Sequence, residues 1–401
     1  MKNIEDIKKD FDIFNNHPNL CYLDSGATSL KPRCVLEKMN EYYKNYGVNI
    51  HRGVYDLSYK ASNEFDQARK EVANFINASD EEIIFTKNVS EALNEVCLMY
   101  ASKLSEGDEV LSSELEHHSS ILPWIHASKK YGFKVNYIEL DQNNRITYDA
   151  FLKALNEKTK IIALTLVSNV LGYKTDIEPI IKEAHKKGII VIVDGAQAIQ
   201  HFKIDVKKMD ADFFAFSGHK MFGPTGVGVL YGKKTLLKDL DPIYYGGDMM
   251  DTASKDDILI KEAPYKFEVG TPAIAEVIGL GEAIKYINSI GFDAIVKKEN
   301  ELREYLFKEA NKIDGITIYN NGSDEAILCY NINKCHPHDA ITMYDEDQIC
   351  LRAGHHCAEL LSRHLKVNGT LRASLSVYNT KEDIDKFIEK TKYIVNFFED
   401  F

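Results

Sequence analysis

Short runs of apolar residues recur along the chain, and each run stops at a polar residue. Residues 189–193 are followed by Asp194, and residues 213–216 are followed by a polar segment that ends at Lys220. Both runs are rich in β-branched or aromatic residues and are too short for an ordinary helix. They therefore predict strands of a parallel sheet that is buried on both faces.

The polar residues that follow these strands are expected to lie together. Ligands of open α/β sheets bind beyond the carboxyl ends of the strands, so Asp194 and Lys220 should share one crevice. Asn169, which follows another apolar run at residues 161–167, joins them. A lysine beside a carboxylate suits pyridoxal phosphate, because the lysine forms a Schiff base and the carboxylate keeps the pyridine nitrogen protonated. The alternative is a structural ion pair at the edge of a sheet.

A helix is predicted to begin within residues 88–91. From Ser90 onward, Leu93, Val96 and Tyr100 follow helical spacing. Free N–H groups and the helix dipole favour a phosphate at such an N-terminus, and Ser90 adds a hydroxyl group. Asparagine and serine are also common helix caps, so a plain N-cap explains the same residues.

Two further segments carry side chains suited to binding. His117 and His118 follow a short strand at residues 110–111, and paired histidines suggest either a metal or an aromatic platform. A zinc site needs more ligands at a workable spacing, and none follows nearby, so no metal site is predicted.

Arg372 precedes a helix capped by Thr380. Its guanidinium group suits a bidentate contact with a substrate carboxylate, although a surface acid would satisfy it as well.

The segment from Arg352 to Cys357 places a cysteine beside two histidines and an arginine. Electropositive surroundings favour the thiolate, which is the reactive form of cysteine. Gly354 indicates a bend that exposes the residues after it. Cys357 is therefore a candidate nucleophile, whereas the remaining cysteines are expected to be inert: Cys21, Cys34, Cys97, Cys329, Cys335 and Cys350.

Composition and charge narrow the class of protein. With 401 residues, of which 44% are hydrophobic and 27% charged, the chain is typical of a globular protein of two or three domains. The net charge of −12 argues against a nucleic-acid or anionic-membrane surface. No apolar run approaches the ~18 residues of a membrane span, and the first residues lack the apolar core of a signal peptide. Seven cysteines without a Cys-x-x-Cys spacing favour the reducing cytoplasm.

Together these motifs resemble those of a known family. Over essentially its whole length, the chain is similar to the class V aminotransferases, which are fold-type-I pyridoxal-phosphate enzymes. Within them it is most similar to the cysteine desulfurases of the SufS-like group. The motifs that carry the resemblance are Ser217-Gly218-His219-Lys220, Arg352-x-Gly354-His355-His356-Cys357-Ala358, Asp194-Gly195-Ala196-Gln197 and Phe267-Glu268-x-Gly270-Thr271-Pro272.

The resemblance implies an α/β fold with two domains. A large domain would hold a mostly parallel central sheet flanked by helices, and a smaller domain would be α+β. The expected boundaries are 20–280 for the large, cofactor-binding domain, with 1–19 and 281–401 forming the small domain that carries the cysteine loop. The enzyme would be a homodimer.

The resemblance also implies roles for individual residues. Lys220 would carry the Schiff base, Asp194 would pair with the pyridine nitrogen, and Gln197 would pair with the phenolic oxygen. His117 would stack on the ring and move protons, and Cys357 would be the nucleophile. The phosphate group would lie among Val89, Ser90, Ser217, His219 and, from the second subunit, Thr271. The substrate would lie among Asn169, Arg372, Arg352 and His51.

The implied reaction converts L-cysteine to L-alanine and leaves a persulfide on Cys357. An acceptor protein of iron–sulfur cluster assembly would then take the sulfur. The chain departs from the family pattern at two places. Val89-Ser90 stands where the group usually has two threonines, so one hydroxyl contact to the phosphate is lost and one is kept. Glu359-Leu360 replaces a proline-containing sequence, which can change the mobility of the cysteine loop.

Other functions compete with this interpretation. A lyase acting on selenocysteine or cysteine sulfinate would use the same cofactor and need Cys357 less, because those substrates have better leaving groups. A transaminase would leave Cys357 without a purpose. A different class is a metal-binding or sulfur-carrier scaffold built on His117, His118, His355, His356 and Cys357.

Overall fold

The computed structural model describes residues 3–399, and its larger part is built on one seven-stranded sheet with the strand order β2-β8-β7-β6-β5-β3-β4. From β4 to β7 neighbouring strands run parallel, whereas β8 runs antiparallel to both β7 and β2. The sheet is therefore mostly parallel, as the apolar runs predict. Its strands are β2 (Ile83–Thr86), β3 (Glu109–Ser113), β4 (Lys134–Ile138), β5 (Thr159–Thr165), β6 (Ile190–Asp194), β7 (Phe213–Ser217) and β8 (Gly228–Gly232).

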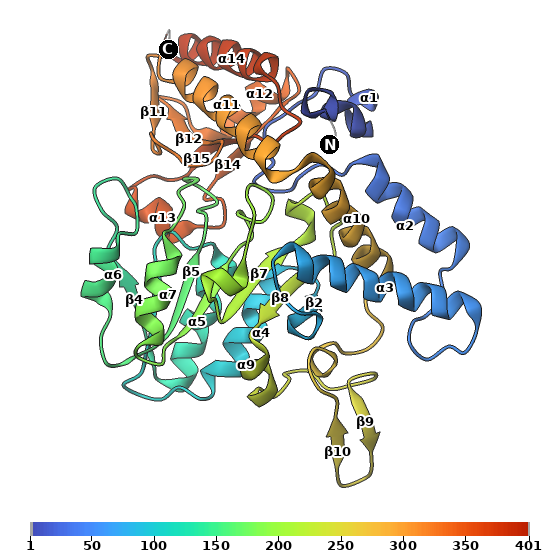
Figure 1. The fold of residues 1–401 in the computed structure, drawn as a ribbon. Coiled ribbons are helices and arrows are strands. Elements are labelled where there is room, and N and C mark those ends of the chain that lie inside the picture. Colours follow the sequence, from blue (N-terminus) through green and yellow to red (C-terminus); the bar gives the residue numbers. More distant parts are fainter. Residues whose placement is uncertain (1–2, 400–401) are drawn as a thin grey trace.

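Helices cover both faces of this sheet (Figure 1). Successive residues of a strand point to opposite faces, and in β7 Phe214 and Phe216 belong to one core cluster, whereas Phe213 and Ala215 belong to another. The first cluster includes apolar residues of α3, α7 and α10, and the second includes those of α4 and α5. The helices of this part are α2 (Arg33–Asn45), α3 (Asp56–Phe75), α4 (Val89–Ala101), α5 (His118–Tyr131), α6 (Tyr148–Ala154), α7 (Ile177–His185), α8 (Val206–Met209), α9 (Lys234–Asp239) and α10 (Ile274–Ile290), with short 3₁₀ turns η2 (Asp80–Glu82), η3 (Gly218–Lys220) and η4 (Tyr265–Phe267).

A smaller antiparallel sheet, in the order β11-β12-β15-β14, lies above the large one in Figure 1. Its apolar residues pack with those of helices from the C-terminal part of the chain in a separate core cluster. The elements are α11 (Phe292–Ala310), β11 (Ile316–Ile318), β12 (Ile327–Ile332), α12 (Pro337–Asp345), β13 (Ile349–Cys350), β14 (Arg352–Gly354), α13 (Glu359–His364), β15 (Thr370–Ser374) and α14 (Lys381–Glu399).

The N-terminal segment contacts both parts of the molecule. Ile7 and Phe11, in η1 (Ile4–Asp10) and just after it, belong to the core cluster of the large sheet. After α1 (Asp12–Asn16), strand β1 (Cys21–Tyr22) pairs in parallel with β13, which lies near the small sheet in sequence. The expected domain boundaries at residues 19 and 280 stay a prediction.

The segment between Tyr244 and Lys266 forms regular structure outside the large and small sheets. It contains a hairpin of β9 (Met250–Ala253) and β10 (Ile258–Ile260), which projects from the body of the molecule (Figure 1). The strands are short and mostly exposed. A strand without a buried face has no need of alternating apolar and polar residues, so the sequence lacks the usual signal.

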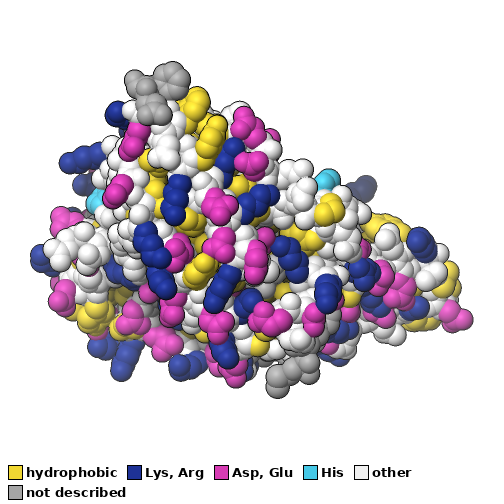
Figure 2. Space-filling view, turned by 90° about the horizontal axis from the view of Figure 1, so that it is seen from above, with side chains coloured by type: hydrophobic (Ala, Val, Ile, Leu, Met, Phe, Trp, Pro, Cys, Tyr) yellow, Lys and Arg dark blue, Asp and Glu magenta, His cyan; other side chains and the backbone are white. Residues whose placement is uncertain are grey.

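The surface of the protein mixes charges of both signs. On the face seen from above, over the small sheet and its helices, basic and acidic side chains are interspersed (Figure 2). No large basic patch covers this face, in keeping with the net charge of −12. No helix among residues 3–399 combines the length and the apolar character needed to cross a membrane.

Candidate active site

A cavity of about 430 Å³ lies where the parallel strands of the large sheet end and the small sheet begins. Strand β6 ends at Asp194, and β7 leads through η3 to Lys220, so both side chains reach this cavity. The small sheet contributes residues from β14, β15 and the turn after β14. The predicted site residues that line the cavity are Val89, Ser90, His117, Asn169, Asp194, Gln197, Ser217, His219, Lys220, Arg352, Cys357 and Arg372.

Two predicted site residues lie outside this cavity. His51 lines a separate cavity of about 360 Å³, together with Gly270 and Pro272. Thr271 lies between these two residues in the chain and is exposed. The structure therefore brings His51 and Thr271 to one region of the surface but not to Lys220. This is the arrangement expected if a second subunit supplies Thr271, and that role stays a prediction.

Lys220 and Asp194 are buried in the wall of the main cavity. Burial lowers the pKa of Lys220 to about 8, although the nearby Asp194 carboxylate opposes the shift. Burial also raises the pKa of Asp194. The N–H group of Ala196 donates a hydrogen bond of 2.9 Å to Asp194 Oδ1 and opposes this rise. Next to Asp194, Gly195 lets the turn approach β7, since a Cβ atom there would lie 2.0 Å from the Phe214 ring.

The N-terminus of α4 borders the same cavity. Asn88 caps this helix by accepting a hydrogen bond from the Glu91 N–H group, so the plain N-cap explanation holds. The Val89 N–H group donates to Ser217 Oγ at 2.8 Å, which joins the helix to the end of β7. The unpaired N–H groups of a helix start attract anions, and the hydroxyl groups of Ser90 and Ser217 lie beside them. An N-cap and a phosphate site are therefore compatible here.

His117 lies at the start of α5 and faces the cavity as a neutral ring. Its Nδ1 accepts a hydrogen bond of 3.1 Å from the Ser119 N–H group, which leaves the proton on Nε2. Burial lowers the pKa of His117 to about 3, and the positive charge of Lys220 adds to this effect. A neutral imidazole can stack on an aromatic ring and still donate one proton.

Cys357 is exposed and lies on a strained turn. His356 and Cys357 have φ angles of 52° and 55°, a region that residues other than glycine rarely adopt. The His118 N–H group donates to the Cys357 carbonyl at 2.7 Å, and Asn169 Nδ2 donates to the His356 carbonyl at 2.7 Å. His118 also accepts from the Glu359 N–H group. The carbonyl groups of the turn are thus held by residues that follow strands of the large sheet, while His356 Nε2 lies 2.9 Å from Thr370 Oγ1 on the small sheet.

Asp24 is a site residue that the sequence analysis did not single out. Its carboxylate accepts hydrogen bonds from Arg352 Nη2 at 2.9 Å and from Arg372 Nη2 at 3.1 Å. Arg372 Nη1 also donates to the Asn169 carbonyl at 2.8 Å. Asp24 lies two residues after the short strand β1, and its role becomes visible only through its contacts with the two arginines.

Several buried atoms in the cavity wall have no partner among the described residues. They include Asn169 Oδ1, Gln197 Oε1 and Arg372 Nε. Buried polar atoms are rarely left unpaired in proteins, so they mark places where a bound molecule supplies the missing partner. The lysine, the carboxylate, the helix N-terminus and the neutral histidine fit pyridoxal phosphate together. The metal-scaffold alternative is not favoured, because Cys357 and the histidines of its set do not form a cluster with ligand geometry among the described residues.

Comparison with known proteins identifies the family. The family model described as aminotransferase class-V matches residues 21–387. The chain belongs to this family. It is 46% identical over 398 residues to a probable cysteine desulfurase from Halalkalibacterium halodurans, covering 97% of this chain and 98% of that protein. The predicted family membership is therefore confirmed.

Solved structures support the same fold class. The apo cysteine desulfurase from Thermococcus onnurineus NA1 superposes with a TM-score of 0.95, at 38% identity, over 99% of both chains. A more distant class-V fold, the C-DES protein with glycine linked to its pyridoxal-phosphate cofactor, gives a TM-score of 0.83 at 20% identity and covers 94% of this chain and 98% of that one. The predicted fold of a pyridoxal-phosphate-dependent transferase is confirmed.

Replacing Asp24 by Asn should destabilise the protein. The change leaves the buried guanidinium of Arg372 without its carboxylate, and breaking a buried ion pair from one side costs about 3–5 kcal/mol. The urea midpoint of the purified protein should fall clearly. Asp12→Asn is the control, because Asp12 pairs with Arg33 on the surface, where ion pairs contribute little. Equal midpoints for the two variants would contradict the role given to Asp24.

Schiff-base formation in cofactor-free protein should depend on pH through Lys220. Only the neutral amine attacks an aldehyde, and the pKa of this amine is lowered to about 8 from 10.5. The rate at which yellow colour appears with pyridoxal phosphate should rise up to about pH 8 and level off above it. Asp194→Asn should move the midpoint to lower pH, and Lys220→Arg should stay colourless. A midpoint near 10.5 would contradict the assigned environment.

Proposed function

We propose that this chain, a pyridoxal-phosphate-dependent cysteine desulfurase, releases sulfur from L-cysteine as a persulfide on Cys357. The observation that carries the proposal is the position of Cys357. An exposed cysteine on a strained turn lines the same cavity as the buried Lys220 and two arginines. A transaminase would have no use for a thiol at this place.

The residues of the large sheet would hold the cofactor. Lys220 would carry it as a Schiff base, Asp194 would face the pyridine nitrogen, and Gln197 the phenolic oxygen. The phosphate would lie at the start of α4, with Val89, Ser90, Ser217 and His219. When bound, pyridoxal phosphate supplies an electron sink for the α-carbon of an amino acid.

The substrate would be oriented by its carboxylate. Arg372 keeps one unpaired donor, Nε, in the cavity wall beside Asn169. Arg352 lies directly opposite it on the neighbouring strand β14. Lys220, once displaced by the substrate, would take the proton from Cα, because burial favours its neutral form at moderate pH. His117, as a neutral donor, is placed to return a proton.

The sulfur then moves to the protein. The thiolate of Cys357 attacks the substrate sulfur, so that an S–S bond forms and the C–S bond breaks. The electron pair of the C–S bond stays on Cβ, which takes a proton and becomes the methyl group of L-alanine. Because Cys357 is exposed, the persulfide is accessible to a second protein. We infer that this protein is an acceptor of iron–sulfur cluster assembly in the cytoplasm.

L-Selenocysteine is a second substrate for the same site. Selenium leaves carbon more easily than sulfur does, so its release would depend less on Cys357. A true selenocysteine or cysteine-sulfinate lyase should therefore keep most of its activity without the thiol, and a cysteine desulfurase should not.

Replacing Cys357 by Ser should abolish sulfide release from L-cysteine in the presence of a thiol reductant. Alanine and sulfide formation should fall by more than about 100-fold, because the nucleophile is lost, while the yellow colour of the bound cofactor remains. Cys350→Ser is the matched control, since Cys350 is half-buried in β13 outside the cavity. Unchanged sulfide release by Cys357→Ser would assign the reaction to another mechanism.

The protein should be a homodimer. Large apolar side chains are exposed around the His51 cavity and on the hairpin, among them Val54 at 87% and Leu259 at 59%. Sedimentation should give twice the chain mass of 45.6 kDa. Val54→Glu combined with Leu259→Glu should shift the protein toward the monomer, whereas Tyr393→Glu, at an exposed site on α14, should not. A monomeric wild type would refute this assignment.

A further inference from the structure

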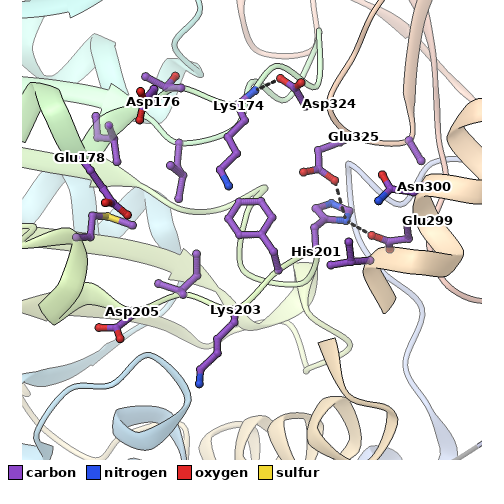
Figure 3. Close-up of a pocket in the computed structure, with 18 of the residues that line it drawn as sticks. Lys174, Asp176, Glu178, His201, Lys203, Asp205, Glu299, Asn300, Asp324 and Glu325 are labelled. Atoms are coloured by element: carbon purple, nitrogen blue, oxygen red, sulfur yellow. Dashed lines mark hydrogen bonds and ion pairs between the residues drawn. The ribbon is translucent and has the colours of Figure 1, made fainter. Parts of the chain in front are cut away.

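A second cavity, lined by charged residues, lies away from Cys357. It measures about 920 Å³ and borders the turn after β6, helix α11 and the segment before β12. Figure 3 shows that charged side chains of both signs line it and that His201, Glu299 and Glu325 lie together at one side. None of these three residues lines the Lys220 cavity, and the proposed reaction does not use them.

The three side chains form a compact cluster from three distant segments. His201 Nδ1 lies 2.8 Å from a Glu299 oxygen and 3.8 Å from a Glu325 oxygen. One nitrogen and two carboxylate oxygens lie within 4.8 Å of one another. Two ligands of one zinc ion, each bonded at about 2.0–2.2 Å, lie about 3–4 Å apart. The cluster therefore needs little movement to hold an ion.

The cluster is buried, and its charges do not balance. The side chains of His201, Glu299 and Glu325 are only 4%, 5% and 11% exposed. Two carboxylates and one imidazolium leave an excess negative charge, which is costly away from water. The charge of Lys174 favours the ionised form of Glu325 and offsets part of this excess, although its Nζ rests 4.0 Å from the centre of the Phe202 ring. A divalent cation with a neutral imidazole would balance both carboxylates.

One unpaired atom of the cluster points to a missing ligand, and a neighbouring amide bears on the tautomer of the histidine. Glu299 Oε1 is buried and has no hydrogen-bond partner among the described residues, although its other oxygen contacts His201. Gln200 Oε1 is buried and unpaired as well, while Gln200 Nε2 lies 3.2 Å from His201 Nε2. The oxygen and nitrogen of an amide side chain are assigned from their hydrogen bonds. If the Gln200 amide is turned by half a rotation, its oxygen accepts a hydrogen bond from the Nε2–H group of His201. Metal-binding histidines commonly donate their second ring N–H in this way.

We propose that His201, Glu299 and Glu325 bind a divalent transition-metal ion, with Zn²⁺ as the ion that best suits one imidazole and two carboxylates. The Gln200 amide holds the histidine in the tautomer that leaves Nδ1 free for the metal. Water fills the remaining coordination positions from the open side of the cavity. The ion replaces the proton that otherwise lies between His201 and Glu299.

The proton is the alternative occupant of this cluster. Burial alone would lower the pKa of His201, but the Glu299 and Glu325 carboxylates outweigh burial and raise it to about 9. Burial raises the pKa of Glu325 to about 7, against the opposing effect of His201. A metal ion binds the deprotonated forms of such side chains, so it competes with this proton for the cluster.

Such an ion would tie the cofactor-binding turn to the small domain. His201 lies four residues after Gln197 on the turn that follows β6, Glu299 lies on α11, and Glu325 precedes β12. His201 already contacts Glu299 and Glu325, and an ion bound to all three side chains would hold these segments together more firmly. The site is thus structural, and its occupancy should be visible in stability rather than in the chemical step.

Zinc binding to chelator-treated, untagged holoenzyme tests the proposal. All proteins carry Cys357→Ser, so that the thiol and its neighbouring histidines do not bind the metal. Equilibrium dialysis should show one Zn²⁺ per chain, and zinc should raise the melting temperature. Loss of an outer partner of a metal typically costs about 10–100-fold in affinity, so Glu325→Gln should weaken binding by at least about 100-fold, and Gln200→Leu by about 10-fold.

Matched variants separate the cluster from the rest of the cavity. Glu178→Gln removes another acid from the same cavity, one that pairs with Lys208 rather than with His201, and should leave zinc affinity unchanged. Glu299→Gln repeats the test if Glu325→Gln does not fold. Absence of stoichiometric zinc, or equal affinity in the Glu325, Glu299 and Glu178 variants, would overturn the proposal and assign the cluster to a shared proton.

X-ray absorption of the zinc-loaded protein identifies the ligand atoms of the ion without any substitution in the cluster. The spectrum should show only nitrogen and oxygen ligands at about 2.0–2.2 Å, including one imidazole. A sulfur contribution, or a spectrum without imidazole, would place the ion elsewhere and overturn the assignment. Because neither measurement depends on sulfide release, the result is independent of the role proposed for Cys357.

Discussion

The candidate site depends on one carboxylate placed between two arginines. Arg352 and Arg372 lie directly opposite each other on β14 and β15, and like charges at such a position repel. Asp24 contacts both guanidinium groups from a segment 348 residues away from Arg372. Its backbone also forms a bridge with Ser374. The same carboxylate therefore aligns the arginines and attaches the N-terminal segment to the small sheet.

The cysteine turn illustrates how the two sheets share the site. Gly354 adopts its positive φ angle readily, but His356 and Cys357 also have positive φ angles, which residues other than glycine rarely adopt. Hydrogen bonds from His118 and Asn169 to the carbonyl groups of the turn compensate for this strain. Both residues follow strands of the large sheet. Cys357, the proposed nucleophile, is thus fixed by the part of the chain that carries Lys220, and both side chains line one cavity.

The sequence predicted the parts of the molecule that are governed by local pattern. The runs that became β6 and β7 are continuous and apolar because both faces of the sheet are covered, and the rule for strand ends then brought Asp194 and Lys220 together. Contacts between distant segments leave no local signal. Asp24 gains its role only from its contacts with Arg352 and Arg372. His201 gains its role from Glu299 and Glu325. The exposed hairpin β9–β10 has no buried face, so its sequence shows no alternation of apolar and polar residues. The roles of individual site residues, the domain boundaries and the position of Thr271 rest on the resemblance and stay predictions.

The cationic groups of the site lie in surroundings that disfavour their charge. Burial lowers the pKa of both Lys220 and Arg372, because it destabilises their charged forms. Unpaired polar atoms lie beside both side chains. An anionic cofactor and a substrate carboxylate supply the missing negative charge and the missing hydrogen-bond partners. A ligand that binds only the folded chain stabilises it in proportion to its affinity. Cofactor binding should therefore stabilise the folded region around Asp194, Lys220 and Arg372. The same buried positive charges that favour an anionic ligand also give the site its reactivity.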